Sequence, residues 1–428
     1  VRHPSESGRL ADQRACAAYM VDLARRYGWE AEAVAVDELA PIVYASYPAP
    51  PGGKRVLLYS HYDVVPAGPH EEWSHPPYGA ARVDGRVIGR GTTDAKANVL
   101  ALVNAFECFR GTRGHAPCGA VLVLDGEEER GSPNLVTFVD RYRDRLRADA
   151  ALSFDGAIDP SGVPKIGLGT SGMLYVELTA TGTPNDLHSA GARLYPNPAW
   201  RLIWALASLK GPDERITIDG FYDDVTPPTA RDRALMGAMS WNDDLVKREL
   251  GLSQFVLGVS GAQALERLLF QPCATVCGFV SGYTGDGPKG IVPSRASAKL
   301  EFRLVPSQTP ERVLALLRSH VDRRGFQDVR VETLATVETA KTDPDSAIAR
   351  AVVAAARTLY GEPIVKPTEE YAGRQGVWLG NYLGMPGVGT GVGPPGHRGH
   401  ATDEFVTEEH YLRGIKFAAA IFEQYAAL

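Results

Sequence analysis

The chain has 428 residues, 44% hydrophobic and 22% charged, which is enough for two or three globular domains. Its formal net charge is −6 and its basic residues are scattered, which argues against a nucleic-acid partner because such binding needs a concentrated basic face. Its apolar runs are far too short to cross a bilayer, which argues against a membrane-spanning protein.

The first part of the chain alternates between helical and strand-like patterns. Helices are predicted over residues 11–27, 94–109 and 134–147, and strands over residues 41–47, 55–61, 119–125 and 148–155. Asp94 is the predicted N-cap of the second helix. Strands that alternate with helices imply a mostly parallel sheet covered by helices on both faces.

The pattern changes after about residue 170. Residues 172–182 and 295–306 alternate between apolar and polar side chains, which predicts half-buried strands of an antiparallel sheet. Helical patterns become frequent again towards the end of the chain. We therefore predict an α/β domain formed by residues 1–170 and 339–428, interrupted by an inserted α+β domain over residues 171–338.

The five cysteines are scattered, and no two have the spacing of a zinc site: Cys16, Cys108, Cys118, Cys273 and Cys277. This pattern favours buried free thiols in a reducing compartment. No basic and apolar secretory start is visible in residues 1–13, so we expect a cytoplasmic protein. Any bound metal must then be held by histidines and carboxylates.

Acidic residues and a histidine follow the carboxyl ends of the predicted parallel strands. These residues are His61, Asp63, residues 127–129 and Asp155, and Asp94 lies at a predicted helix start. In open α/β sheets, ligands bind in the crevice beyond such strand ends. Each acidic loop alone is more typical of a solvated turn, but together the acidic groups would repel strongly without a cation among them. The pattern therefore predicts a metal site.

Seven motifs resemble those of the M20 family of di-zinc metallopeptidases, and most closely its carnosinase-like dipeptidase branch. They occur in the family's order over nearly the whole chain: SHYDVVPAG, GRGTTDAKAN, GEEERGS, SFDG, DLHSAG, FRLVPSQTP and GHATDE. The resemblance implies that residues 1–170 and 339–428 form the metal-binding catalytic domain. It also implies that residues 171–338 form a lid or dimerisation domain, and hence that the protein is a homodimer.

The resemblance further implies two zinc ions per subunit, with manganese or cobalt as substitutes. The implied ligands are His61, Asp94 and Asp155 for one ion, and His400, Asp94 and Glu129 for the other. His397 is a rival ligand, but the family's last motif, a histidine followed four residues later by a glutamate, fits His400 with Glu404.

Further residues are assigned roles by the same resemblance. Asp63 is implied to hold the His61 imidazole in one tautomer. The motif GEEERGS offers three glutamates for two roles, and spacing alone leaves the choice open. The family pattern makes Glu128 the general base and Glu129 the ligand, which leaves Glu127 solvated or paired with a basic neighbour.

Two residues of the inserted domain resemble residues that act on the substrate. His188 resembles a histidine that reaches the partner subunit's active site and stabilises the developing oxyanion, whereas a strand-end histidine bonded to the backbone is the simpler reading. Arg303 resembles an arginine that pairs with the substrate's free carboxylate, and the alternative is an arginine facing solvent.

The implied function is hydrolysis of an amide bond in a small dipeptide-like substrate with a free carboxylate, as in a dipeptidase of carboxypeptidase type. A hydroxide bridging two zinc ions would attack the carbonyl, with Glu128 as general base. An N-acyl-amino-acid deacylase or a pathway-specific amidohydrolase stays open as an alternative, as does a non-catalytic binding member of the fold. Departures from the dipeptidase pattern at AGARLYPNP, at Gly290 and at EEYAGRQG (369–376) concern substrate specificity.

Overall fold

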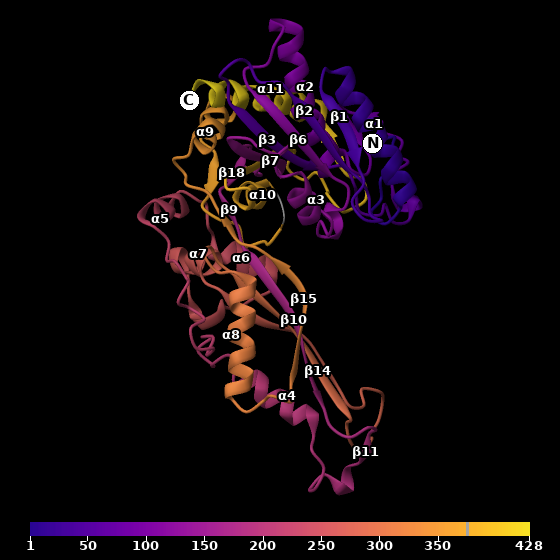
Figure 1. Cartoon of the computed structure of the whole chain (residues 1–428), viewed down its shortest axis with the longest axis vertical. Helices are drawn as coiled ribbons and strands as arrows, with labels where there is room; N and C mark the ends of the chain where they lie inside the picture. The colour runs from indigo at the N-terminus through magenta and orange to yellow at the C-terminus, as the bar shows by residue number, and fades with distance from the viewer. Residues whose placement is uncertain (374–375) are drawn as a thin grey trace. The chain divides into compact units, whose positions relative to one another are not determined.

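The computed structural model describes residues 1–373 and 376–428, and residue contacts divide the chain into two compact units. The first, here called the α/β unit, comprises Val1–Gly169, Lys341–Thr368 and Gly373–Leu428. The second, the inserted unit, comprises Thr170–Ala340 and Glu369–Ala372. Figure 1 shows both units, coloured along the chain. Within the described residues, no helix is both long and apolar enough to cross a membrane.

The α/β unit is built on an eight-stranded sheet with the order β1-β2-β6-β3-β7-β18-β8-β17. The strands are β1 (Glu30–Val34), β2 (Ile42–Tyr47), β3 (Arg55–His61), β6 (Gly119–Asp125), β7 (Ala150–Ala157), β8 (Lys165–Gly167), β17 (Ile364–Lys366) and β18 (Gly387–Gly393). Strands β6, β3, β7 and β18 run parallel to one another, whereas β1 and β2 are antiparallel additions at one edge. The predicted mostly parallel sheet is therefore confirmed.

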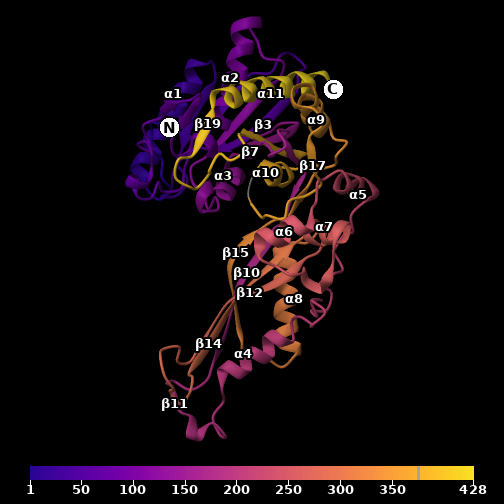
Figure 2. The ribbon, with the colours of Figure 1, turned by 180° about the vertical axis from the view of Figure 1, so that it is seen from behind.

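Helices cover both faces of this sheet, whose central strands are mostly buried. They are α1 (Leu10–Arg26), α2 (Ala97–Arg113), α3 (Leu135–Tyr142), α9 (Ala347–Tyr360), α10 (Gly376–Tyr382) and α11 (Glu408–Ala427). Figure 2 shows α2 and α11 above the sheet and α3 and α10 below it. Every residue of β6 is buried, as a strand covered on two sides requires.

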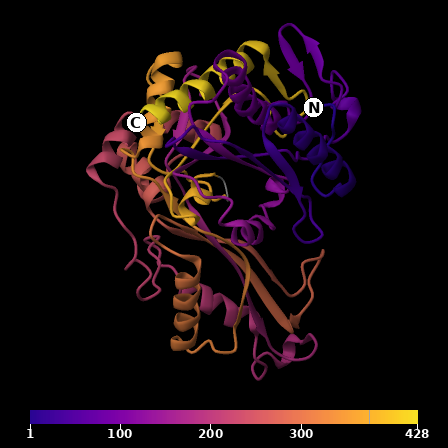
Figure 3. The same ribbon diagram turned by 45° about the horizontal axis from the view of Figure 1, so that its top comes forward.

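A small three-stranded sheet joins two distant parts of this unit. Its strands are β4 (Ala81–Val83), β5 (Arg86–Ile88) and β19 (Phe405–Thr407), in the order β19-β5-β4. Figure 3 shows the yellow strand β19 beside the purple hairpin of β4 and β5. The segment that precedes β19 is therefore brought close to the segment that follows β5.

The predicted N-cap role of Asp94 is wrong. Helix α2 begins at Ala97, and Thr92–Lys96 form an irregular turn in which Asp94 has φ −112° and ψ 87°, outside the helical region. The backbone N–H of Asp94 instead donates to Oε1 of Glu404, 3.1 Å away. A tertiary contact thus holds Asp94 out of the helix that its sequence neighbours predict.

The inserted unit carries an antiparallel sheet with the order β12-β14-β10-β15. Its strands are β10 (Gly172–Thr181), β12 (Cys273–Ser281), β14 (Arg295–Leu304) and β15 (Arg330–Val337). One face packs against α4 (Pro198–Ala207) and α8 (Pro310–Arg323). Alternate residues of the central strands, such as Val176 and Leu300, are buried there, so the predicted antiparallel α+β module is confirmed.

Shorter elements complete the inserted unit. The helices are α5 (Ala230–Gly237), α6 (Asp243–Leu250) and α7 (Gly261–Phe270), and the strands β11 (Leu187–His188) and β13 (Ile291–Val292) pair with each other. Two further strands, β9 (Gly169–Thr170) and β16 (Ala340–Lys341), lie where the chain passes from one unit to the other.

The prediction of buried thiols holds for only part of the set. Cys16 and Cys118 are buried, whereas Cys108, Cys273 and Cys277 are exposed, and all five are free. The apolar run around Cys273 and Cys277 forms β12, which is an edge strand of the four-stranded sheet. An edge position leaves side chains exposed that the same sequence would bury in a central strand.

Candidate metal centre

The carboxylate of Asp94 lies between two histidines. Its Oδ1 is 3.0 Å from Nε2 of His61, and its Oδ2 is 3.0 Å from Nε2 of His400. Each oxygen therefore faces a different imidazole. This is the arrangement that a carboxylate shared by two metal ions requires.

Each histidine also faces a second carboxylate. His61 Nε2 lies 3.3 Å from Oδ1 of Asp155, and His400 Nε2 lies 3.2 Å from Oε2 of Glu129. Ligand atoms of His61, Asp94 and Glu129 all lie within 4.8 Å of one another. The fold thus brings together the five side chains predicted as ligands.

The sheet explains how three of these side chains meet. His61 ends β3, Asp155 lies near the end of β7, and Glu129 follows β6 in a short turn. Strand β3 lies between β6 and β7 and runs parallel to both, so the carboxyl ends of all three strands open onto the same edge. Loops carry the other two side chains to this edge.

Asp63 contacts His61 on the side of the imidazole that faces away from Asp94. Its Oδ1 lies 3.2 Å from Nδ1 of His61, opposite the nitrogen that faces Asp94. Its oxygens also accept hydrogen bonds from the backbone N–H groups of Glu128 (3.2 Å) and Glu129 (3.1 Å) and from the Ser7 hydroxyl (2.6 Å). One buried carboxylate therefore orients both a histidine and the turn that carries two glutamates.

The electrostatics of the cluster favour positive charge. Burial raises the pKa of Glu128 to about 8 and that of Glu129 to about 7, and neighbouring carboxylates add to both effects. A hydrogen bond with Asp94 raises the pKa of His400 to about 9, although burial opposes it. The raised pKa values mean that Glu128, Glu129 and His400 all bind protons more strongly than usual, because this cluster contains more carboxylates than positive charges.

Comparison with known proteins decides the family. The sequence model described as peptidase family M20/M25/M40 matches residues 57–424. This chain belongs to the M20 peptidase family. The predicted family is therefore confirmed, and the chain is a hydrolytic enzyme.

Several curated relatives of this M20 peptidase are dipeptidases. The beta-Ala-His dipeptidase of Homo sapiens is 26% identical over 410 residues, which cover 91% of this chain and 78% of the relative. The rat enzyme of the same name is 25% identical over 407 residues, which cover 91% of this chain and 80% of the rat enzyme. A Cys-Gly metallodipeptidase of Schizosaccharomyces pombe is 27% identical over 291 residues, covering 67% and 60%.

Solved structures agree with this assignment. An M20 family metallo-carboxypeptidase from Sulfolobus solfataricus is 32% identical, with a TM-score of 0.87 over 100% of this chain and 97% of the other. Human carnosine dipeptidase 1 is 24% identical, with a TM-score of 0.72 over 100% and 95%, and supports the fold alone.

The residues present in this M20 peptidase fit divalent metal ions. Oε1 of Glu129 is buried and has no hydrogen-bond partner within the part of the chain that the structure describes, and Oδ1 of Asp155 is buried with the His61 imidazole 3.3 Å away. Buried carboxylate oxygens without donors are costly unless a cation satisfies them. Mixed histidine and carboxylate sets with room for further ligands suit catalytic zinc and also manganese or cobalt.

Two neighbours that competed for these roles make other contacts. Glu127 is buried, accepts the backbone N–H of Ala40 at 3.0 Å and lies 3.5 Å from Nη1 of Arg130. Its predicted pairing with a basic neighbour is confirmed, and the solvated alternative is wrong. His397 turns its Nδ1 towards the backbone N–H of Gly399 at 3.0 Å, whereas His400 faces Asp94.

The two predicted substrate contacts belong to the inserted unit. His188 is exposed, and its Nδ1 accepts the backbone N–H of Ala190 at 3.0 Å, as a strand-end histidine bonded to its own turn would. Arg303 is half-buried on β14 and forms an ion pair with Glu301, two residues before it. The predicted roles of both residues stay predictions.

Sequence reasoning gave no role to the partners that hold the turn of Asp94. Arg90 is buried, and its Nη1 donates to Oε2 of Glu404 at 2.8 Å. Glu404 entered the prediction only as the end of a motif. The signal was present, because a glutamate four residues after a ligand histidine follows the family pattern, but the sequence does not show what that glutamate contacts.

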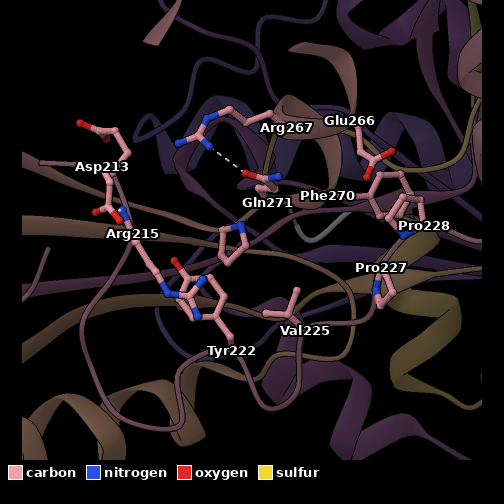
Figure 4. Close-up of a pocket in the computed structure, with 12 residues that line it drawn as sticks. Asp213, Arg215, Tyr222, Val225, Pro227, Pro228, Glu266, Arg267, Phe270 and Gln271 are labelled. Carbon is pink, nitrogen blue, oxygen red and sulfur yellow. Dashed lines mark hydrogen bonds between the residues drawn. The ribbon is translucent and has the colours of Figure 1, made fainter. Parts of the chain in front are cut away.

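A cavity of about 450 Å³ in the inserted unit does not belong to the metal centre (Figure 4). The guanidinium of Arg215 lies 4.4 Å from the ring of Tyr222, and Arg267 donates to Gln271 at 2.8 Å. None of the candidate ligands lines this cavity. Both arginines thus contact other residues that line the cavity, and we assign the cavity no ligand.

Proposed function

We propose that this M20 peptidase hydrolyses an amide bond in a small dipeptide-like substrate that has a free carboxylate. The observation that carries the proposal is the position of Asp94, whose two oxygens each lie 3.0 Å from a different histidine. His61, Asp94 and Asp155 would hold one divalent ion, and His400, Asp94 and Glu129 the other. A bound pair of zinc ions would supply Lewis acidity, which would polarise the scissile carbonyl and favour deprotonation of the attacking water.

Glu128 is the general base in this proposal. It follows β6 beside the ligand Glu129, and Asp63 fixes its backbone through a hydrogen bond of 3.2 Å. The Glu128 carboxylate takes a proton from the attacking water and returns it to the leaving amine. A base in this position contributes typically about 10²–10⁴-fold to the rate.

The inserted unit has features that support a homodimer. Its edge strand β12 exposes Val276, Phe279 and Val280, and helix α4 exposes Trp200 and Trp204, whose rings stack at 5.9 Å. An apolar edge strand is a template for pairing with another chain, and exposed apolar patches mark association surfaces. In the dimer, His188 of one subunit would steady the oxyanion formed in the other.

Arg303 would recognise the substrate's carboxylate, since its planar guanidinium can pair with it through two hydrogen bonds. The dipeptidase names of the curated relatives support a dipeptide as the substrate.

The stretch 369–376, which departs from the dipeptidase pattern, includes residues 374–375, and these lie outside the described residues. An N-acyl-amino-acid deacylase is the second candidate because the departures fall on specificity positions. The cytoplasmic location stays a prediction.

A substrate screen tests the proposal. The protein is stripped with a chelator, reloaded with zinc, manganese or cobalt, and assayed for amine release from dipeptides, N-acyl amino acids and N-carbamoyl compounds. We expect hydrolysis only after reloading, with dipeptides as the best substrates. Preference for N-acyl amino acids would favour the deacylase, and a metal-loaded protein that cleaves nothing would favour a binding protein.

A further inference from the structure

Glu404 is a buried carboxylate that holds the turn carrying Asp94. Its Oε1 accepts hydrogen bonds from the backbone N–H groups of Thr93 (2.8 Å) and Asp94 (3.1 Å). Its Oε2 accepts from the backbone N–H of Gly91 (2.9 Å) and from Nη1 of Arg90 (2.8 Å). Each oxygen thus receives two donors, and the residue has no exposed surface.

The charge of Glu404 is balanced inside the protein. Arg90 is itself buried, and its guanidinium lies 5.2 Å from the ring centroid of Trp73. A buried carboxylate is tolerated only when its oxygens are satisfied and its charge is paired. Arg90 supplies the opposite charge, which leaves three of the four hydrogen bonds for the backbone of the turn.

The same contacts join the two loops that carry candidate ligands. His400 lies four residues before Glu404 in one loop, and Asp94 lies in the other. The Thr93 hydroxyl donates to the carbonyl of Phe405 at 2.7 Å, and the N–H of Gly89 donates to the carbonyl of Glu404 at 2.8 Å. A shift of either loop would therefore change the distance between Asp94 and His400.

The position of Asp94 makes this support important. Its carboxylate must present one oxygen to each histidine, and its backbone is neither helical nor part of a strand. Regular secondary structure does not fix such a backbone, so the contacts of individual side chains and of the neighbouring turn must do so. The hydrogen bond from the N–H of Asp94 to Glu404 is the contact nearest to the carboxylate it must aim.

We propose that Glu404 is a positioning residue that sets the Asp94 carboxylate between His61 and His400 and thereby sets the affinity and geometry of the metal centre. This inference rests on the proposed function, because it requires Asp94 and the two histidines to bind metal. Groups that hold a ligand in place from outside typically change metal affinity or activity by about 10–100-fold when they are replaced.

The test is a cobalt titration of the metal-free Glu404→Gln protein. Glutamine keeps the size of the side chain but turns an NH₂ group towards two of the four donors, so the turn loses part of its support. We expect cobalt to bind about 10–100-fold more weakly, with an altered visible absorption spectrum of the bound ion. For a cleaved dipeptide, kcat should fall while KM changes little.

Asp232→Asn is the matched control. Asp232 is a buried carboxylate of the inserted unit, and its Oδ2 accepts hydrogen bonds from the backbone N–H (2.8 Å) and the hydroxyl (2.7 Å) of Thr229. This substitution should lower the melting temperature and leave cobalt affinity and spectrum unchanged. An equal loss of cobalt affinity in both variants would mean that general destabilisation explains the effect, and would overturn the proposal.

Glu404→Asp provides a second variant if the glutamine protein does not fold. It keeps the charge but is one methylene shorter, so it cannot reach both pairs of donors, and cobalt binding should again weaken. Wild-type cobalt affinity and spectrum in either folded variant would overturn the positioning role, as would unfolding of both variants. A wild-type protein that binds no cobalt would instead overturn the proposed function on which the inference rests.

Discussion

The two histidines of the metal centre occupy very different surroundings. The His61 side chain is 1% exposed and ends a central strand, whereas the His400 side chain is 56% exposed and lies in a loop. His400 has φ 63°, and Arg398 and Asp403 in the same loop also have positive φ. Such backbone is uncommon outside glycine and persists only where surrounding contacts impose it. One histidine of the centre is thus part of the sheet, and the other is held by loop contacts.

Replacing Asp94, which faces both histidines, should have the largest effect because it disrupts both halves of the metal centre. Asp94→Ala removes the carboxylate that faces both histidines, so we expect loss of both ions and of detectable hydrolysis. Metal content per subunit, measured by elemental analysis, checks this prediction. Asp144→Ala, which alters an exposed carboxylate, is the control and should keep both ions. One ion retained by the Asp94 variant would contradict the shared role.

A substitution of Glu128 should lower the rate of hydrolysis without loss of either metal ion. Glu128→Gln keeps the shape of the side chain but cannot accept a proton, so we expect kcat to fall by about 10²–10⁴-fold. Elemental analysis should still find two ions per subunit. Full activity in this metal-loaded variant would eliminate Glu128 as the general base.

The metal-free protein should reveal the difference between the two histidines directly. His61→Ala removes the imidazole that the buried carboxylates of Asp63 and Asp155 share, so we expect a loss of about 3–5 kcal/mol in the free energy of unfolding. His400→Ala should lower it by only about 0–1 kcal/mol, because that side chain is largely exposed and solvent screens its pairing with Asp94 and Glu129. Urea denaturation without metal measures both values, and equal losses would contradict the comparison.

Removal of metal should occur in two phases. We expect the ion near His400 to leave first when a chelator is added, because solvent reaches that side more easily. Cobalt absorption followed over time should show a fast and a slow phase, and His400→Ala should lose the fast one. A single phase in the wild-type protein would mean that the two ions exchange together.

The half of the centre on the sheet follows from the sequence in simple physical terms. Apolar strands that end in His61 and Asp155 predict a parallel sheet whose carboxyl edge collects polar groups, and the fold has this sheet. The turn of Asp94 does not follow, because helical spacing in residues 94–109 predicts an N-cap. The competing influence is Glu404, which is 310 residues further along the chain.

Exposure was harder to predict than strand formation. The run that contains Cys273 and Cys277 does form a strand, but neither cysteine is buried, because the strand lies at the edge of its sheet. Glu127 shows the reverse error, since a charged loop residue became buried by accepting the N–H of Ala40. Burial in both cases depends on which distant segment of the chain packs against the residue, and the local sequence pattern does not show this.

The pairing of β19 with β5 has a consequence for the newly made protein. The segment with His400 and Glu404 leaves the ribosome only after the whole inserted unit has been synthesised. Until then the Asp94 turn lacks the three hydrogen bonds that its backbone donates to Glu404. A nascent polypeptide from which Glu404 has not yet emerged therefore has an incomplete centre, even though its inserted unit has already been synthesised.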